Sequence, residues 1–270
     1  MTRPMVGISV ADFAAHRGHT AAAVYRSVDY IEYGGLAPPG QCEEIAFALA
    51  ANASLRFGRH LVSTDLPRDL DHDREADQIL ADVQGVQCEY FLTDVGFWSL
   101  GGRREGNSWP RPCSLDVNIA NTVRANCLGL RDRLGLPVLP ENPAIIAVRA
   151  NITMAEFMAH IGRDLDICLD VGHFWAFCRN YDLDPHDEID KVPLDSVRVM
   201  HIAGLSPVRY AGRQLFLDNH DVIPNSACLS LLHDLVARCP RLGWVTYEAE
   251  MATLEVQEAG LNKVMQACGG

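Results

Sequence analysis

The chain has 270 residues and a mass of 29.7 kDa, is 48% hydrophobic and 21% charged, and carries a formal net charge of −12 at pH 7. This length and composition are ordinary for a globular protein with a sizeable core. The acidic balance disfavours nucleic acid and anionic membrane surfaces as partners, and no apolar run reaches the 18 residues of a spanning helix.

The cysteines and the N-terminal segment indicate the compartment. The nine cysteines are scattered without a CxxC pair, a pattern typical of reduced, buried thiols. The first residues, MTRPMVGISVADF, contain no apolar signal-peptide region. We therefore expect a cytoplasmic protein.

Short apolar runs alternate with helix-like segments along the chain. The predicted strands lie within residues 6–10, 29–35, 54–63, 88–97, 137–145, 166–174, 197–204 and 243–251. Clear helical patterns cover 114–135, 153–162 and 226–239, with Ser114 and Thr153 as expected N-caps and Glu156 completing a capping box. Eight strand–helix repeats predict an α/β fold, a closed (β/α)8 TIM barrel, rather than a doubly wound sheet. No linker divides the chain, so residues 1–270 are predicted to form one domain.

Polar residues gather at the ends of the predicted strands. The segment FLDNHDVIP (216–224) is an example, because strand periodicity sends Asp218 and His220 to the same face. The carboxyl ends of barrel strands meet in a ring, where active sites of this fold lie. The residues that we expect to converge there are His60, Asp94, Glu141, Asp170, His173, His201, Asp218, His220 and Glu248.

This set of side chains predicts a metal centre at the C-terminal mouth of the barrel. So many carboxylates in one cleft disfavour their own ionisation unless cations neutralise them. Imidazole and carboxylate ligands suit Zn, Mn or Fe, and the absence of cysteine from the set disfavours a structural zinc site. Carboxylates that bridge two ions are usual in multinuclear centres.

The motifs LPENP, LDVGH, HIAG, DNHD and YEAE together resemble the DUF692 (UPF0276) family of multinuclear non-haem iron-dependent oxidative enzymes, within the xylose-isomerase-like barrel superfamily. Members such as the methanobactin-biosynthesis oxidase modify cysteines or nearby residues in ribosomally made peptides. The resemblance implies two or three irons in mixed Fe(II)/Fe(III) states and O2 as co-substrate. It also implies a precursor peptide as substrate and a small partner protein that presents it.

The resemblance also assigns roles to residues. Glu250 corresponds to a position with an acid/base role in relatives, and Asp94 is a second candidate for moving protons. Val95 stands where the family usually has a ligating histidine, which puts a third metal in doubt and leaves a two-metal centre intact. The implied metal ligands are His60, Glu141, Asp170, His173, His201, Asp218, His220 and Glu248.

Other functions remain open from the sequence. The same ligand types occur in endonuclease IV-like hydrolases, although the acidic balance is unsuited to DNA. A metal-dependent sugar isomerase or epimerase needs two carboxylates and one ion, fewer ligands than this chain offers. A barrel that only binds peptides is the non-enzymatic alternative, because fold alone does not decide function.

Overall fold

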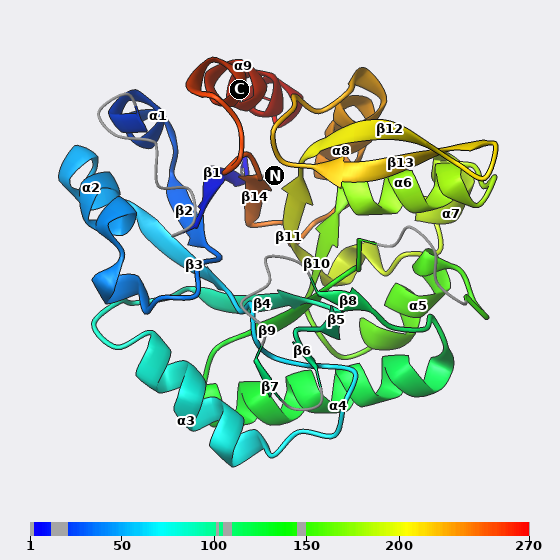
Figure 1. Cartoon of the computed structure of the whole chain (residues 1–270), viewed down its shortest axis with the longest axis horizontal. Helices are drawn as coiled ribbons and strands as arrows, with labels where there is room; N and C mark the ends of the chain where they lie inside the picture. The colour runs from blue at the N-terminus through cyan, green and yellow to red at the C-terminus, as the bar shows by residue number, and fades with distance from the viewer. Residues whose placement is uncertain (1–2, 12–20, 101–102, 105–109, 145–149, 270) are drawn as a thin grey trace.

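The computed structural model describes residues 3–11, 21–100, 103–104, 110–144 and 150–269. Eight parallel strands close into a barrel in the order β1-β14-β11-β10-β9-β4-β3-β2, with helices around the outside (Figure 1). Each strand overlaps one predicted run, so the (β/α)8 fold is confirmed. The barrel strands are β1 (Met5–Val10), β2 (Tyr30–Tyr33), β3 (Arg56–His60), β4 (Tyr90–Asp94), β9 (Val138–Glu141), β10 (Ile167–Asp170), β11 (Val197–Ile202) and β14 (Trp244–Tyr247).

Helices α3 to α9 begin at side-chain caps, which the sequence predicted in part. The capping box of Thr153 and Glu156 is confirmed, but the N-cap at Ser114 is wrong, because the Asp116 carboxylate accepts the first backbone N–H groups of that helix. Among the described helices, none combines the length and apolarity needed to cross a membrane. The helices are α1 (Ala21–Ser27), α2 (Glu43–Ala51), α3 (His72–Asp82), α4 (Val117–Leu134), α5 (Met154–Ile161), α6 (Val171–Asn180), α7 (Pro185–Ile189), α8 (Ser226–Arg238) and α9 (Leu254–Ala267), with 3-10 turns η1 (Pro39–Gln41) and η2 (Leu194–Ser196).

The interior of the barrel below the mouth is filled by large side chains from alternate strand positions. A small buried cluster there contains Tyr30 and Tyr90, with apolar residues of β4, β9 and β11. Glycine makes room for both rings: a Cβ added at Gly7 would lie 2.6 Å from the Tyr30 ring, and one at Gly58 would lie 2.4 Å from Tyr90. This layer forms a solid floor beneath the strand ends.

The described residues also form three antiparallel two-stranded ribbons outside the barrel sheet. The largest pairs β12 (Gly204–Tyr210) with β13 (Arg213–Asn219) and packs against α6 (Figure 1). Two short ribbons follow β4: β5 (Gly96–Phe97) with β8 (Arg111–Pro112), and β6 (Ser99–Leu100) with β7 (Arg103–Arg104). The predicted loop 96–113 thus contains local strands where it is described, while residues 101–102 and 105–109 lie outside the described residues.

One predicted strand continues into a helix. The sequence predicts an extended run over 166–174, but β10 ends at Asp170 and α6 begins at Val171. The reason is local, since the Asp170 side chain accepts the backbone N–H of His173 and caps the helix. That one domain covers residues 1–270 stays a prediction.

Candidate metal centre

The barrel brings the predicted side chains to its mouth. His60, Asp94, Glu141 and Asp170 are the last residues of β3, β4, β9 and β10, and His201 lies near the end of β11. His173 stands in the first turn of α6, Asp218 near the end of β13, His220 in the turn that follows, and Glu248 and Glu250 directly after β14. Their side chains are at most 12% exposed, so the whole group is removed from bulk water.

His201 lies at the centre of this group. Its Nδ1 is 3.2 Å from Glu141 Oε2 and 3.4 Å from Glu248 Oε1. Its Nε2 faces the opposite way, 2.9 and 3.1 Å from the two carboxylate oxygens of Glu32. One ring nitrogen therefore faces the cluster and the other is held by a residue behind it.

His173 and His220 are held in a similar manner. His173 Nδ1 donates to the Asn142 carbonyl oxygen at 2.9 Å, while Nε2 faces Asp218 Oδ2 at 3.5 Å. His220 Nδ1 lies 2.8 Å from Glu250 Oε1, and Nε2 lies 2.7 Å from Asp218 Oδ2. Metal-binding histidines are typically fixed in this way, with the second nitrogen bonded to a carboxylate or a carbonyl.

Several buried atoms in the cluster lack a hydrogen bond of suitable geometry, although some have an ion-pair partner nearby. Buried polar groups are rarely left in this state unless a bound species satisfies them. The donor set therefore fits a metal ion. Among the described residues, these atoms include Glu141 Oε2, Asp170 Oδ2, His173 Nε2, His201 Nδ1 and both carboxylate oxygens of Asp218.

Within the part of the chain that the structure describes, four overlapping groups have ligand atoms close enough to hold an ion, within 4.8 Å of one another. Glu141 is common to three of them, so it can bridge neighbouring positions. The groups are Glu141 with Asp170, His201 and Glu248; His60 with Asp94 and Glu141; Glu32 with His60 and Glu248; and Glu141 with Cys168 and His201.

Two of these residues were not among the sequence predictions. Glu32 lies in β2 with a fully buried side chain, and accepts a hydrogen bond from the Tyr90 hydroxyl at 2.7 Å. Its signal in the sequence was a lone acid in the otherwise apolar strand YIEY. Strand periodicity places it on the barrel interior, two residues above Tyr30.

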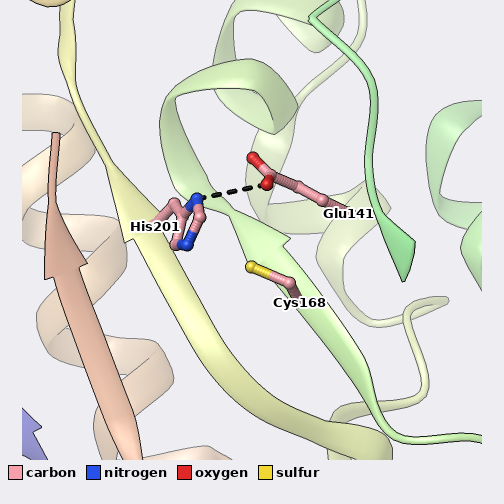
Figure 2. Close-up of side chains that lie close together, drawn as sticks. All are labelled: Glu141, Cys168 and His201. Atoms are coloured by element: carbon pink, nitrogen blue, oxygen red, sulfur yellow. Dashed lines mark ion pairs between the residues drawn. The ribbon is translucent and has the colours of Figure 1, made fainter. Parts of the chain in front are cut away.

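Cys168 is the second unpredicted residue. Its sulfur points toward the same space as Glu141 and His201 (Figure 2). Burial raises the pKa of its thiol well above the usual value, which disfavours the thiolate that binds metals. The other eight cysteines are also free and buried, as the sequence predicted.

Val95 does not contribute to the cluster. Its side chain is fully buried within the larger apolar core, and its backbone N–H donates to the Glu141 carbonyl oxygen at 3.1 Å. The neighbouring Asp94 faces inward and lies 3.1 Å from His60 Nε2. A carboxylate is thus available at the position where the histidine is missing.

The charged groups in the cluster shift one another's pKa values. Burial alone would lower the pKa of each imidazole, but the surrounding carboxylates raise it above its usual value, strongly for His173, His201 and His220. Burial would raise the pKa of Glu250, but His220 and hydrogen bonds from Ser9 and the backbone lower it to about 2. Burial dominates at Glu141 and Glu248, whose pKa values are raised.

A cavity of about 250 Å3 leads to the cluster. Carboxylates and imidazoles form its floor, and Val10, Val62, Trp98 and Met251 form apolar parts of its wall. Met251 is 51% exposed, so it marks the outer edge of this cavity. The shape suits one side chain of a larger substrate.

Comparison with known structures shows the fold. A xylose isomerase domain protein from Planctomyces limnophilus has a TM-score of 0.59 at 15% identity, covering 98% of both chains. The 3-keto-D-glucoside 4-epimerase YcjR from E. coli has a TM-score of 0.55 at 16% identity, covering 99% of this chain and 100% of that one. These likenesses extend over nearly the whole chain and support the closed (β/α)8 barrel fold that the sequence predicted.

Comparison with known sequences narrows the assignment from a fold to a protein family. It is 35% identical over 109 residues to a UPF0276 protein of Caulobacter vibrioides, and covers 38% of that relative's length. The family model described as "RiPP precursor modification enzyme MbnB/TglH/ChrH", where RiPP denotes a ribosomally synthesised and modified peptide, matches residues 75–267. This span includes every predicted metal ligand except His60. The chain therefore belongs to the MbnB/TglH/ChrH family of RiPP precursor modification enzymes.

Proposed function

We propose that this chain oxidises a cysteine, or a residue beside it, in a ribosomally synthesised peptide, using O2 and a centre of two or three iron ions. Membership of a family of precursor-modifying enzymes supports the substrate class. The observation on which the proposal mainly rests is the size of the donor set. Four imidazoles and their carboxylates exceed what one ion needs, and Glu141 is positioned to bridge.

The donors suggest distinct metal positions. The first consists of Glu141, Asp170, His201 and Glu248. The second consists of His173, His220 and the Asp218 carboxylate between them. A third position consists of His60, Asp94 and Glu141, while Val95 stands where the family has a ligating histidine.

Bound iron would polarise a cysteine thiol as a Lewis acid and would relay electrons from the peptide to O2. The chain's own carboxylates would handle the protons. Asp94 and Glu250 both have lowered pKa values, so at neutral pH they are ionised and accept protons rather than donate them. Each O2 that is reduced to two waters takes up four electrons and four protons, so it removes four hydrogen atoms from the peptide.

The cavity limits how a peptide binds. Its volume of about 250 Å3 accommodates a side chain and adjacent backbone, but not a folded segment. The remainder of the precursor must therefore lie outside the mouth. A small partner protein that presents the peptide is therefore part of the proposal.

A metal-dependent sugar isomerase or epimerase is the second candidate. The first metal position alone, with three carboxylates and one imidazole, resembles what a single Mn or Mg ion needs for that chemistry. This alternative leaves His173, Asp218 and His220 without a role. It also predicts turnover without O2.

The first experiment is metal analysis by mass spectrometry with a visible spectrum, on protein produced in iron-supplemented cells. We expect two or more irons per chain and ferric charge-transfer absorption. O2 consumption should then depend on a cysteine-containing precursor peptide. Stoichiometric zinc or manganese without iron would favour the hydrolase or isomerase instead.

A matched pair of variants tests the metal positions. His220→Ala removes an imidazole from the second position, so the iron content should fall by about one ion per chain, with the barrel intact. Asp94→Asn changes only the third position and should retain two irons. Equal metal loss in both variants would contradict the separate positions proposed here.

A further inference from the structure

Glu32 differs from the other carboxylates of the mouth in what it contacts. Its Oε2 accepts the Tyr90 hydroxyl at 2.7 Å and the Thr246 hydroxyl at 3.3 Å. The Thr246 hydroxyl is itself 2.7 Å from the Tyr30 hydroxyl. Glu32 is thus anchored to the tyrosine floor of the barrel, beneath the proposed metal positions.

The same carboxylate contacts His201 and is matched to the orientation of its ring. His201 Nε2 points down to Glu32, at 2.9 and 3.1 Å, and Nδ1 points up to Glu141 and Glu248. This is the reverse of His173 and His220, whose Nδ1 atoms are held from behind and whose Nε2 atoms face the cluster. A buried carboxylate stabilises the imidazole tautomer whose proton it accepts.

We infer that Glu32 is a positioning residue that keeps the proton of His201 on Nε2 and so presents Nδ1 as the metal-binding nitrogen. The inference rests on the proposed metal centre but not on its oxidative chemistry. Glu32 acts through His201, because its Oε2 is engaged by Tyr90 and Thr246 and its Oε1 lies 2.9 Å from His201 Nε2, nearer than the 3.8 Å to His60 Nδ1. The anchored carboxylate also resists rotation of the ring when no metal is bound.

The test uses the full chain loaded with zinc, a diamagnetic probe, and with 15N-labelled histidine. Long-range 1H–15N NMR spectra report which ring nitrogen carries the proton, and His201→Gln identifies the His201 signals. In the unmodified protein we expect His201 to be protonated at Nε2, and His173 and His220 at Nδ1. This measurement requires no variant of Glu32, so it decides the inference even if such a variant fails to fold.

Variants then measure the size of the effect. Glu32→Gln should weaken zinc binding at one position by about 10- to 100-fold, in competition with a chelator, and give a mixture of His201 tautomers. Tyr90→Phe removes one anchor but keeps the carboxylate, so a smaller loss and one tautomer are expected. The control is Glu188→Gln, a buried glutamate on α7 that pairs with Lys191, which should change neither readout.

Three results overturn the inference. One is a His201 proton on Nδ1 in the zinc-loaded protein, and another is unchanged zinc affinity in Glu32→Gln. The third is a cobalt-loaded Glu32→Gln protein whose absorption spectrum reports a lost ligand, since Glu32 would then bind metal directly. An unmodified chain that binds no zinc, cobalt or iron would instead refute the metal centre itself.

Discussion

Asp170 uses its two carboxylate oxygens for different tasks. Oδ1 accepts the backbone N–H of His173 and caps α6, while Oδ2 is buried without a hydrogen-bond partner among the described residues and faces the proposed first metal position. Asp170→Asn keeps an oxygen that can cap the helix but removes the charge. Asp170→Ala removes both, so the two substitutions separate the structural role from the metal-binding role.

We expect both variants to lose metal from the first position. In metal-free protein, Asp170→Ala should have a free energy of unfolding about 1 kcal/mol below that of Asp170→Asn, because only the alanine loses the cap. Urea unfolding and metal analysis of the two variants provide the measurements. Full metal content in Asp170→Asn would exclude this carboxylate as a ligand.

Residues at strand ends could be predicted from the sequence, and residues further inside could not. Glu141 and Asp170 stand out because each polar side chain terminates an apolar run, and His60 ends the strand RFGRH. Glu32 and Cys168 lie within their strands, at interior positions that resemble ordinary alternation. Alternation can place them on the interior face, but it is closure of the barrel that brings their side chains together with residues of other strands.

At the scale of elements, the strand–helix pattern of the sequence did not predict the β12–β13 hairpin. Its turn contains Ala211 and Gly212, both with positive φ, rather than the Asn-Gly pair that marks such turns in sequences. The hairpin pairs Leu205 with Asp218 and ends at Asn219, immediately before His220. Asp218 and His220 thus lie close together as predicted, but they are not on one strand: Asp218 belongs to β13 and His220 to the turn that follows it.

The base of this hairpin fits closely against the segment after His220. A Cβ added at Gly204 would lie 2.2 Å from the Val222 carbonyl oxygen, so that backbone would have to move. We expect Gly204→Ala to destabilise the protein by about 1–3 kcal/mol and to weaken the second metal position specifically. Thermal unfolding and metal stoichiometry test both parts.

Gly243→Ala is the matched control, since its added Cβ would meet nothing closer than the Arg198 carbonyl oxygen at 3.8 Å. It should retain stability and metal content. If Gly204→Ala lost stability but bound the second ion as tightly as before, the hairpin base would have no role in placing Asp218 and His220.

At the scale of the whole molecule, the closed barrel gathers more negative than positive charge at its mouth. Four imidazoles face seven carboxylates there: Glu32, Asp94, Glu141, Asp170, Asp218, Glu248 and Glu250. Neighbouring acids raise the pKa values of the histidines, and at Glu141 and Glu248 burial raises the pKa of the acid itself. In the metal-free protein, protons therefore supply part of the charge that cations would otherwise provide.

This exchange of protons for metal predicts a pH dependence with a definite sign. A raised pKa keeps His173, His201 and His220 protonated at pH 7, whereas a metal binds only the neutral ring. Metal binding should therefore release protons, and the affinity should rise as the pH increases toward those pKa values. Asp218 and Glu250, with lowered pKa values, are already ionised at pH 7 and should add nothing to the release.

Calorimetric titration with zinc, in buffers of different ionisation enthalpy at pH 7, measures the released protons. We expect the unmodified chain to release more than one, and His173→Ala to release roughly one fewer, because that ring no longer gives up a proton. The control is His233→Gln, an exposed histidine on α8 that should leave the number unchanged. If the heat of zinc binding did not depend on the buffer, no protons would be released, and the imidazoles would be neutral before the metal binds. The carboxylates and histidines of this barrel would then not stabilise one another in their charged forms.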